Sequence, residues 1–173
     1  MDRAEGRGMH NLTREESARL RDLLLASARE FEPEWATRSG RFVVPGPAVS
    51  KLASDQGAAH ILNGFSWGGY EQIYGLTTER LGKSKEDQAV LANLEDIADW
   101  RWPGKADVLL ASTDHMVAVL ITTDDFILVA GDRVFVETAL GMTLDQARTS
   151  FQAYARERAL NAPHLPELAE QYR

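Results

Sequence analysis

One serine of the chain lies in a pattern that is typical of nucleophilic catalysis. The residues Gly64-Phe65-Ser66-Trp67-Gly68 match G-x-S-x-G, in which the serine stands on a tight turn between a strand and a helix, and small neighbours make that turn possible. An acid and a histidine later in the chain complete the triad of such a hydrolase. Here Asp114 or Asp132 could supply the acid, and His164 could supply the base. A small serine hydrolase that uses Ser66 is therefore one hypothesis.

The elements around Ser66 do not favour that hypothesis. α/β Hydrolases place the serine in a mostly parallel sheet, but the residues upstream of Ser66 carry chiefly the pattern of one long helix. The strands predicted downstream form a meander, which is antiparallel. Three fixed positions also match by chance in about one ordinary chain of this length in twenty. We therefore favour a structural turn, with Ser66 as an ordinary polar turn residue.

Three segments have the periodicity of amphipathic helices. A Thr-x-x-Glu capping box begins at Thr13 and precedes apolar residues at helical spacing, which predicts a helix over 14–32. The second predicted helix, over 85–99, has a clean apolar stripe and an opposite face rich in carboxylates. The third, over 144–159, follows a Thr-x-x-Gln box that begins at Thr143.

A run rich in Val, Ile, Leu and Phe separates the last two of these helices. Turn residues interrupt it at intervals of about eight to ten residues, which is typical of an antiparallel β-meander. The strands predicted within this meander, at about 106–138, are 106–111, 115–122, 126–130 and 133–138. N-terminal helices, then strands, then a closing C-terminal helix together predict an α+β fold with an antiparallel sheet.

The chain has 173 residues, a length at which one domain can bury a full core. We expect a flexible N-terminal tail over 1–12, a single α+β domain over 13–160 and a C-terminal tail over 161–173. No apolar run approaches eighteen residues, so no membrane span is expected. The charged N-terminus does not resemble a signal peptide, and cysteine is absent, which together predict a cytoplasmic protein.

The formal net charge of the chain is −7. Nucleic-acid binding depends largely on Lys and Arg that neutralise phosphates, so an acidic chain is not expected to bind nucleic acid. The acidic balance suits either solubility alone or a basic protein partner. The four histidines show no metal-ligand spacing, and no phosphate-binding glycine pattern is present, so we expect neither a metal nor a cofactor.

The stretch Asn63–Leu76 concentrates glycines and aromatic residues. It holds four of the thirteen glycines, one of the four tryptophans and two of the four tyrosines. Aromatic side chains beside glycine turns can anchor a partner, and interface hot spots favour Trp and Tyr. The candidate partner-binding residues are Trp67, Tyr70, Glu71 and Tyr74, together with the carboxylates Glu86, Asp87, Glu95, Asp96 and Asp99 of the helix predicted over 85–99. The alternative for those carboxylates is an ordinary solvated helix face.

Several short segments occur in an order that resembles a known family. They are Asn63-Gly64, Tyr74-Gly75-Leu76, the strand run Val108-Leu109-Leu110-Ala111, Arg133-Val134-Phe135-Val136 and Ser150-Phe151-Gln152-Ala153-Tyr154. In this order they resemble the SMI1/KNR4-like (SUKH) family of small bacterial immunity proteins, over about residues 48–159. The resemblance implies a non-catalytic cytoplasmic protein that binds a cognate toxin and blocks its active site or its access to substrate.

A protein-binding module is therefore the leading hypothesis for this chain. We expect an immunity protein, or antitoxin, that neutralises a toxin with a basic surface by occluding it. A small serine hydrolase and a secretion-chaperone-like acidic protein are the alternatives. A fluorophosphonate probe separates the first alternative from the leading hypothesis, because it should label a serine hydrolase and spare its Ser66→Ala variant.

Overall fold

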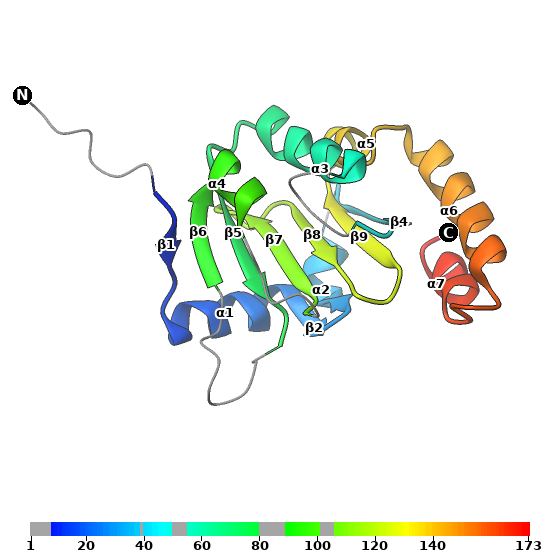
Figure 1. The fold of residues 1–173 in the computed structure, drawn as a ribbon, viewed down its shortest axis with the longest axis horizontal. Helices are drawn as coiled ribbons and strands as arrows, with labels where there is room; N and C mark the ends of the chain where they lie inside the picture. The colour runs from blue at the N-terminus through cyan, green and yellow to red at the C-terminus, as the bar shows by residue number, and fades with distance from the viewer. Residues whose placement is uncertain (1–7, 39, 50–54, 80–88, 101–105) are drawn as a thin grey trace, which may run out of the picture.

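The fold is built on a seven-stranded sheet that carries helices on both faces (Figure 1). We describe it from a computed structural model, which describes residues 8–38, 40–49, 55–79, 89–100 and 106–173. The strands of these residues are β1 (His10–Asn11), β2 (Leu25–Ser27), β3 (Glu30–Phe31), β4 (Phe42–Pro47), β5 (Gln72–Thr77), β6 (Ala89–Asn93), β7 (Val108–Ser112), β8 (Ala118–Ile121) and β9 (Phe126–Gly131). The helices are α1 (Arg14–Leu24), α2 (Pro33–Ala36), α3 (Gln56–Trp67), α4 (Leu94–Asp99), α5 (Arg133–Leu140), α6 (Leu144–Arg158) and α7 (Leu165–Gln171).

The strands of the main sheet are arranged in the order β1-β6-β5-β7-β8-β9-β4. Every neighbouring pair in that order is antiparallel. The short strands β2 and β3 pair with each other in a separate two-stranded sheet. The antiparallel sheet with its helices confirms the predicted α+β fold.

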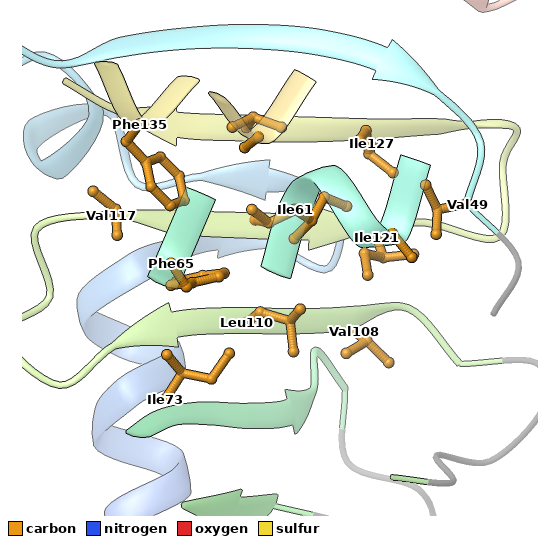
Figure 2. Packing of buried hydrophobic residues seen from close by; sticks show 14 of the residues in the cluster. Val49, Ile61, Phe65, Ile73, Val108, Leu110, Val117, Ile121, Ile127 and Phe135 are labelled. Carbon is orange, nitrogen blue, oxygen red and sulfur yellow. The ribbon is translucent and has the colours of Figure 1, made fainter. Parts of the chain in front are cut away.

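Two apolar cores lie on opposite faces of the sheet. Helices α3, α4 and α5 cover one face, which we call the α3 face, and α1, α2 and α7 cover the other, the α1 face. Successive residues of β7 alternate between them, so Val108 and Leu110 point towards α3 (Figure 2) whereas Leu109 and Ala111 join the α1 face. Because both faces are covered, the central strands are nearly continuous apolar runs.

Both predicted capping boxes are present. The Thr13 amide donates to Glu16 Oε2 over 2.7 Å, and the Glu16 amide donates to Thr13 Oγ1 over 3.2 Å. Helix α1 nevertheless ends at Leu24, not at residue 32, because the chain then folds back on itself through the β2–β3 pair. The equivalent box at Thr143 begins α6, whose bounds agree with the predicted helix 144–159 to one residue.

The predicted helix over 85–99 is wrong in its first half. Residues Ala89–Asn93 form β6, which is hydrogen-bonded between β1 and β5, and helix α4 begins only at Leu94. Pairing with two strands outweighs the local helical periodicity of this apolar run. The Asn93 side chain accepts a hydrogen bond from the Asp96 amide over 2.8 Å and so marks where the helix starts. Residues 85–88 lie outside the described part of the chain.

The fourth predicted strand, over 133–138, is the helix α5. Asp132 caps this helix by accepting a hydrogen bond from the Phe135 amide over 2.8 Å, and Gly141 ends it in the left-handed conformation at φ 68°. The buried residues Phe135, Val136 and Ala139 have helical spacing. The alternation that predicted a strand was therefore misleading.

Both predicted tails contain regular structure. Within the predicted tail 1–12, His10–Asn11 form β1 and pair with β6, and residues 1–7 lie outside the described part. Within the predicted tail 161–173, α7 presents the buried residues Leu165 and Ala169 to the α1-face core. The C-terminal segment is thus part of the packed domain.

Helix α6 passes along the edge of the sheet beside β4 (Figure 1). Leu144 and Ala147, in its first turns, pack into the α3-face core, whereas Phe151 and Ala155 pack into the α1-face core. The strand β4 is the last in the order and contains two prolines, which an edge strand tolerates because its open side forms no ladder hydrogen bonds.

Candidate partner-binding site

The first four G-x-S-x-G residues are the last four residues of α3, and Gly68 is the C-cap of that helix. Helix α3 continues through Ser66 to Trp67, and the chain turns only at Gly68 and Gly69, the latter with φ 79°. A Cβ on Gly64 would lie 2.9 Å from the Cβ of Ala139 in α5. The predicted turn at Ser66 is therefore wrong, and the first glycine of the pattern allows two helices to approach closely.

The structure does not bring the predicted triad together. At one end of the sheet, which we call the β7–β8 end, β7 turns into β8, β9 leads into α5, and α3 finishes. Ser66 lies at this end. His164 lies at the opposite end, where its Nε2 is 2.8 Å from the carbonyl oxygen of Asp124 in the β8–β9 turn. Asp132 caps α5, as described above.

The turn between β7 and β8 is closed by hydrogen bonds to the carboxylate of Asp114. Tyr70 Oη donates to Asp114 Oδ2 over 3.1 Å, and Ser112 Oγ donates to Asp114 Oδ1 over 2.7 Å. The Met116 amide donates to the same Oδ1 over 3.0 Å, and Val117 donates its amide to Ser112 Oγ over 3.1 Å. Asp114 thus links the hairpin to the segment that follows α3.

Residues from distant parts of the chain support the same hairpin from the α1 face. His115 has the left-handed conformation at φ 59°, and its ring stacks on Tyr74 with 5.9 Å between centroids. The Trp35 Nε1 donates to the His115 carbonyl oxygen over 2.9 Å, and Arg41 Nε donates to the Met116 carbonyl oxygen over 3.2 Å. The backbone of the turn is therefore held from both faces of the sheet.

Three large apolar side chains are exposed at the β7–β8 end. Trp67 at the end of α3 is 78% exposed, Met116 in the hairpin is 55% exposed, and Val134 in the first turn of α5 is 63% exposed. Each lies within two residues of a member of a buried trio, which is Phe65, Val117 and Phe135. Figure 2 shows this trio together at one end of the α3-face core, and the Phe65 and Phe135 ring centroids are 5.1 Å apart. We call Trp67, Met116 and Val134 the end patch.

Carboxylates accompany the end patch. Burial raises the pKa of the Tyr70 hydroxyl, and the charges of Asp114 and Asp132 raise it further. Burial alone would raise the pKa of Asp114 too, but hydrogen bonds from the Ser112 hydroxyl, the Met116 amide and Tyr70 lower it below its usual range. Asp114 is therefore a carboxylate at neutral pH, so the end patch has an acidic border.

Replacing Asp114 by alanine should destabilise the protein at neutral pH and do less harm in acid. Because the folded-state pKa is lowered, the ionised form stabilises the fold above the ordinary Asp pKa of about 3.9, and this contribution is lost as the pH falls through the lower folded value. We expect Asp114→Ala to lower the free energy of unfolding by about 1 kcal/mol at pH 7. Urea denaturation of both proteins at pH 7, 5 and 3 measures the difference between their free energies of unfolding. If this difference stays constant down to pH 3, the ionised carboxylate does not stabilise the fold.

The acidic helix face is smaller than the sequence predicted. Glu95, Asp96 and Asp99 lie on the six-residue helix α4, and Glu86 and Asp87 lie outside the described residues. Glu95 and Asp96 occupy the first helical turn, where negative charge interacts favourably with the helix dipole. This local role accounts for two of the carboxylates without any partner.

The structure brings the predicted aromatic residues to one end of the sheet but not to one face of it. Tyr70 packs against the α3-face core and Tyr74 against the α1-face core, and Glu71 between them is exposed. The residues that sequence analysis did not assign to this site are Met116 and Val134. One signal for Val134 was present, since an Asp at 132 with a Gly at 141 frames a short helix that begins at residue 133.

General features of the described residues limit what kind of site this is. Among them, no group of three or more His, Asp or Glu side chains could hold a metal ion. None of their helices is long and apolar enough to cross a membrane. Comparison of the chain with protein-family models, with curated proteins and with solved structures found no match. The site is therefore interpreted from its own geometry.

Proposed function

We propose that this chain is a protein-binding module that acts as an immunity protein, or antitoxin, by binding a cognate protein toxin and occluding it. The observation that carries the proposal is the exposed side chain of Trp67 on a rigid helix end, with Met116 and Val134 also exposed at that end of the sheet. Tryptophan contributes strongly to interfaces, because its large apolar surface is removed from water when a partner binds. A tryptophan left 78% exposed is a natural anchor for another protein.

The charge of the chain supports a basic partner. The net charge is −7, and Glu71 and Asp114 are exposed carboxylates at the same end of the sheet as the exposed tryptophan. Opposite charge on a toxin surface would speed association and disfavour acidic competitors. The resemblance to the SUKH family of immunity proteins points in the same direction.

Occlusion requires a rigid surface rather than a chemical step. The hydrogen bonds of Asp114 and the support from Trp35 fix the β7–β8 turn before any partner arrives. Little conformational freedom is then lost on binding, which favours a tight complex. In this proposal the chain inhibits by covering the toxin's active site or the path of its substrate.

Co-expression with the product of the adjacent gene tests the proposed function. We expect the adjacent-gene product to stop growth when it is expressed alone, and to be harmless when it is co-expressed and co-purified with this chain. An unrelated acidic protein of similar size is the control for nonspecific protection. If the adjacent-gene product is innocuous and nothing co-purifies, the immunity proposal fails, and labelling of Ser66 by a fluorophosphonate probe becomes the next experiment.

A further inference from the structure

We propose that the end patch of Trp67, Met116 and Val134 is the surface that contacts the partner, and that its occupant is an apolar area bordered by Lys or Arg on a protein surface. This inference rests on the proposed function, because it assumes that the chain binds a protein. It assigns the contact to the β7–β8 end instead of the acidic helix α4. It also adds Met116 and Val134 to the residues expected from the sequence.

Half of the exposed large apolar side chains that the structure describes lie at the β7–β8 end. Six large hydrophobic residues of the described part are substantially exposed, and three of them form the end patch. The other three are Met9, Leu23 and Leu160. Single exposed apolar residues are normal, whereas several at one end of a domain mark an interaction site. Three elements that are remote in sequence contribute one residue each.

The backbone segments that carry the three residues of the end patch are closely packed. Helices α3 and α5 pack so closely that a Cβ on Gly64 would meet Ala139, and a Cβ on Gly131 would lie 2.7 Å from Phe135 and 2.8 Å from Val117. The exposed residues therefore stand on backbone that cannot easily move. A preorganised patch binds with a small loss of conformational entropy, as an interface hot spot requires.

The charge around the end patch identifies the chemistry of the partner. Glu71, Asp114 and Asp132 are exposed carboxylates at this end. The positive charge of Arg133 is offset by Glu137, whose Oε1 lies 3.1 Å from Arg133 Nε. Arg41 contacts the end patch itself, since its Nη2 lies 4.0 Å from Met116 Sδ and its Nε donates to the Met116 carbonyl oxygen over 3.2 Å. Among the described residues named here, the four carboxylates Glu71, Asp114, Asp132 and Glu137 outnumber the two cations Arg41 and Arg133. The net charge at this end is therefore negative, so a partner with cationic residues around an apolar contact is complementary.

Binding rates of matched variants test the inference. The probe is the adjacent-gene product, recovered from the co-purified complex, refolded and immobilised for interferometry. We expect Trp67→Ala and Val134→Asp each to dissociate at least tenfold faster than wild type, because hot-spot contacts act mainly on dissociation. Leu160→Asp is the matched control, since Leu160 is 97% exposed and follows α6, away from the patch. It should bind within twofold of wild type.

Charge is tested separately from apolar contact. Glu71→Gln should slow association at low salt and leave dissociation nearly unchanged, because an exposed charge at the border steers the encounter. Circular dichroism and thermal unfolding of every variant check that the exposed substitutions leave the fold intact.

The outcomes separate the inference from the proposed function. If wild type binds and both patch variants dissociate like wild type, the proposed function stands and the end patch is not the contact surface. If nothing co-purifies with wild type, the proposed function fails and this inference fails with it. Faster dissociation of both patch variants with an unchanged Leu160→Asp supports the inference.

Discussion

The Phe65→Ala substitution should lower the free energy of unfolding by about 3–5 kcal/mol relative to wild type. Phe65 is fully buried in the α3-face core, and its ring meets Phe135 edge to face at 5.1 Å and Tyr70 at 6.3 Å. The substitution removes this apolar surface and leaves a cavity between α3, α5 and the sheet. Guanidinium denaturation followed by circular dichroism measures the change.

The next residue provides the matched control for this variant. Ser66 is exposed on the same helical turn, so Ser66→Ala should change the free energy of unfolding by no more than about 0.5 kcal/mol. A loss below about 1 kcal/mol for Phe65→Ala would mean that α3 does not pack on the sheet as described. The pair of variants therefore tests the position of α3, which also carries Trp67.

Gly64→Ala should destabilise the protein by about 1–3 kcal/mol, although alanine is the better helix former. A Cβ at this position would lie 2.9 Å from the Cβ of Ala139 and 3.2 Å from its Cα. The backbone of α5 cannot move away without disturbing its own packing, so the two helices would be forced apart. If Gly64 were merely a helical residue, the substitution would instead stabilise by about 1 kcal/mol. The sign of the change in urea denaturation decides between these cases.

A second substitution tests the cause of that change. In an Ala139→Gly background the nearest Cβ is gone and only backbone atoms at 3.2 Å and 3.3 Å remain close, so adding Gly64→Ala should destabilise the protein much less. The double-mutant cycle would then show a coupling energy of about 1–3 kcal/mol between the two positions. An equal loss in both backgrounds would place the origin of the effect elsewhere.

Local signals predicted the elements whose boundaries are set by local hydrogen bonds. The capping boxes at Thr13 and Thr143 fixed the starts of α1 and α6, because both partners of each box are three residues apart. The strands β7, β8 and β9 also agree with the predicted meander, since turn residues separate runs that are buried on both faces.

Elements that depend on distant partners were not predictable from periodicity. The run Ala89–Asn93 has helical spacing but becomes β6, because β1 and β5 supply hydrogen-bond partners on both sides. The run Val134–Val136 alternates like a strand but belongs to α5, because Asp132 caps this helix and the Phe135 ring packs against Phe65. In each case the deciding contact comes from elsewhere in the fold.

The candidate site was predictable only in part for the same reason. The sequence indicated Trp67, Tyr70 and Tyr74 as candidate contact residues because each is adjacent to a glycine. The carboxylate of Asp114 could be assigned to a turn but not to Tyr70, which is 44 residues away and becomes its neighbour only when the sheet forms. The match of Ser66 to a hydrolase pattern carried no information about its helical surroundings.

The prolines of β4 determine how other chains can attach to this molecule. Pro45 and Pro47 are alternate residues of the outermost strand, so their nitrogen atoms face the side opposite β9. Neither nitrogen carries a hydrogen, and α6 runs alongside, so this border offers a poor template for a strand from another chain. Edge-to-edge association of sheets from different molecules is therefore disfavoured at β4. A partner that approaches this border must recognise side chains, which gives sequence-specific discrimination that main-chain pairing cannot provide.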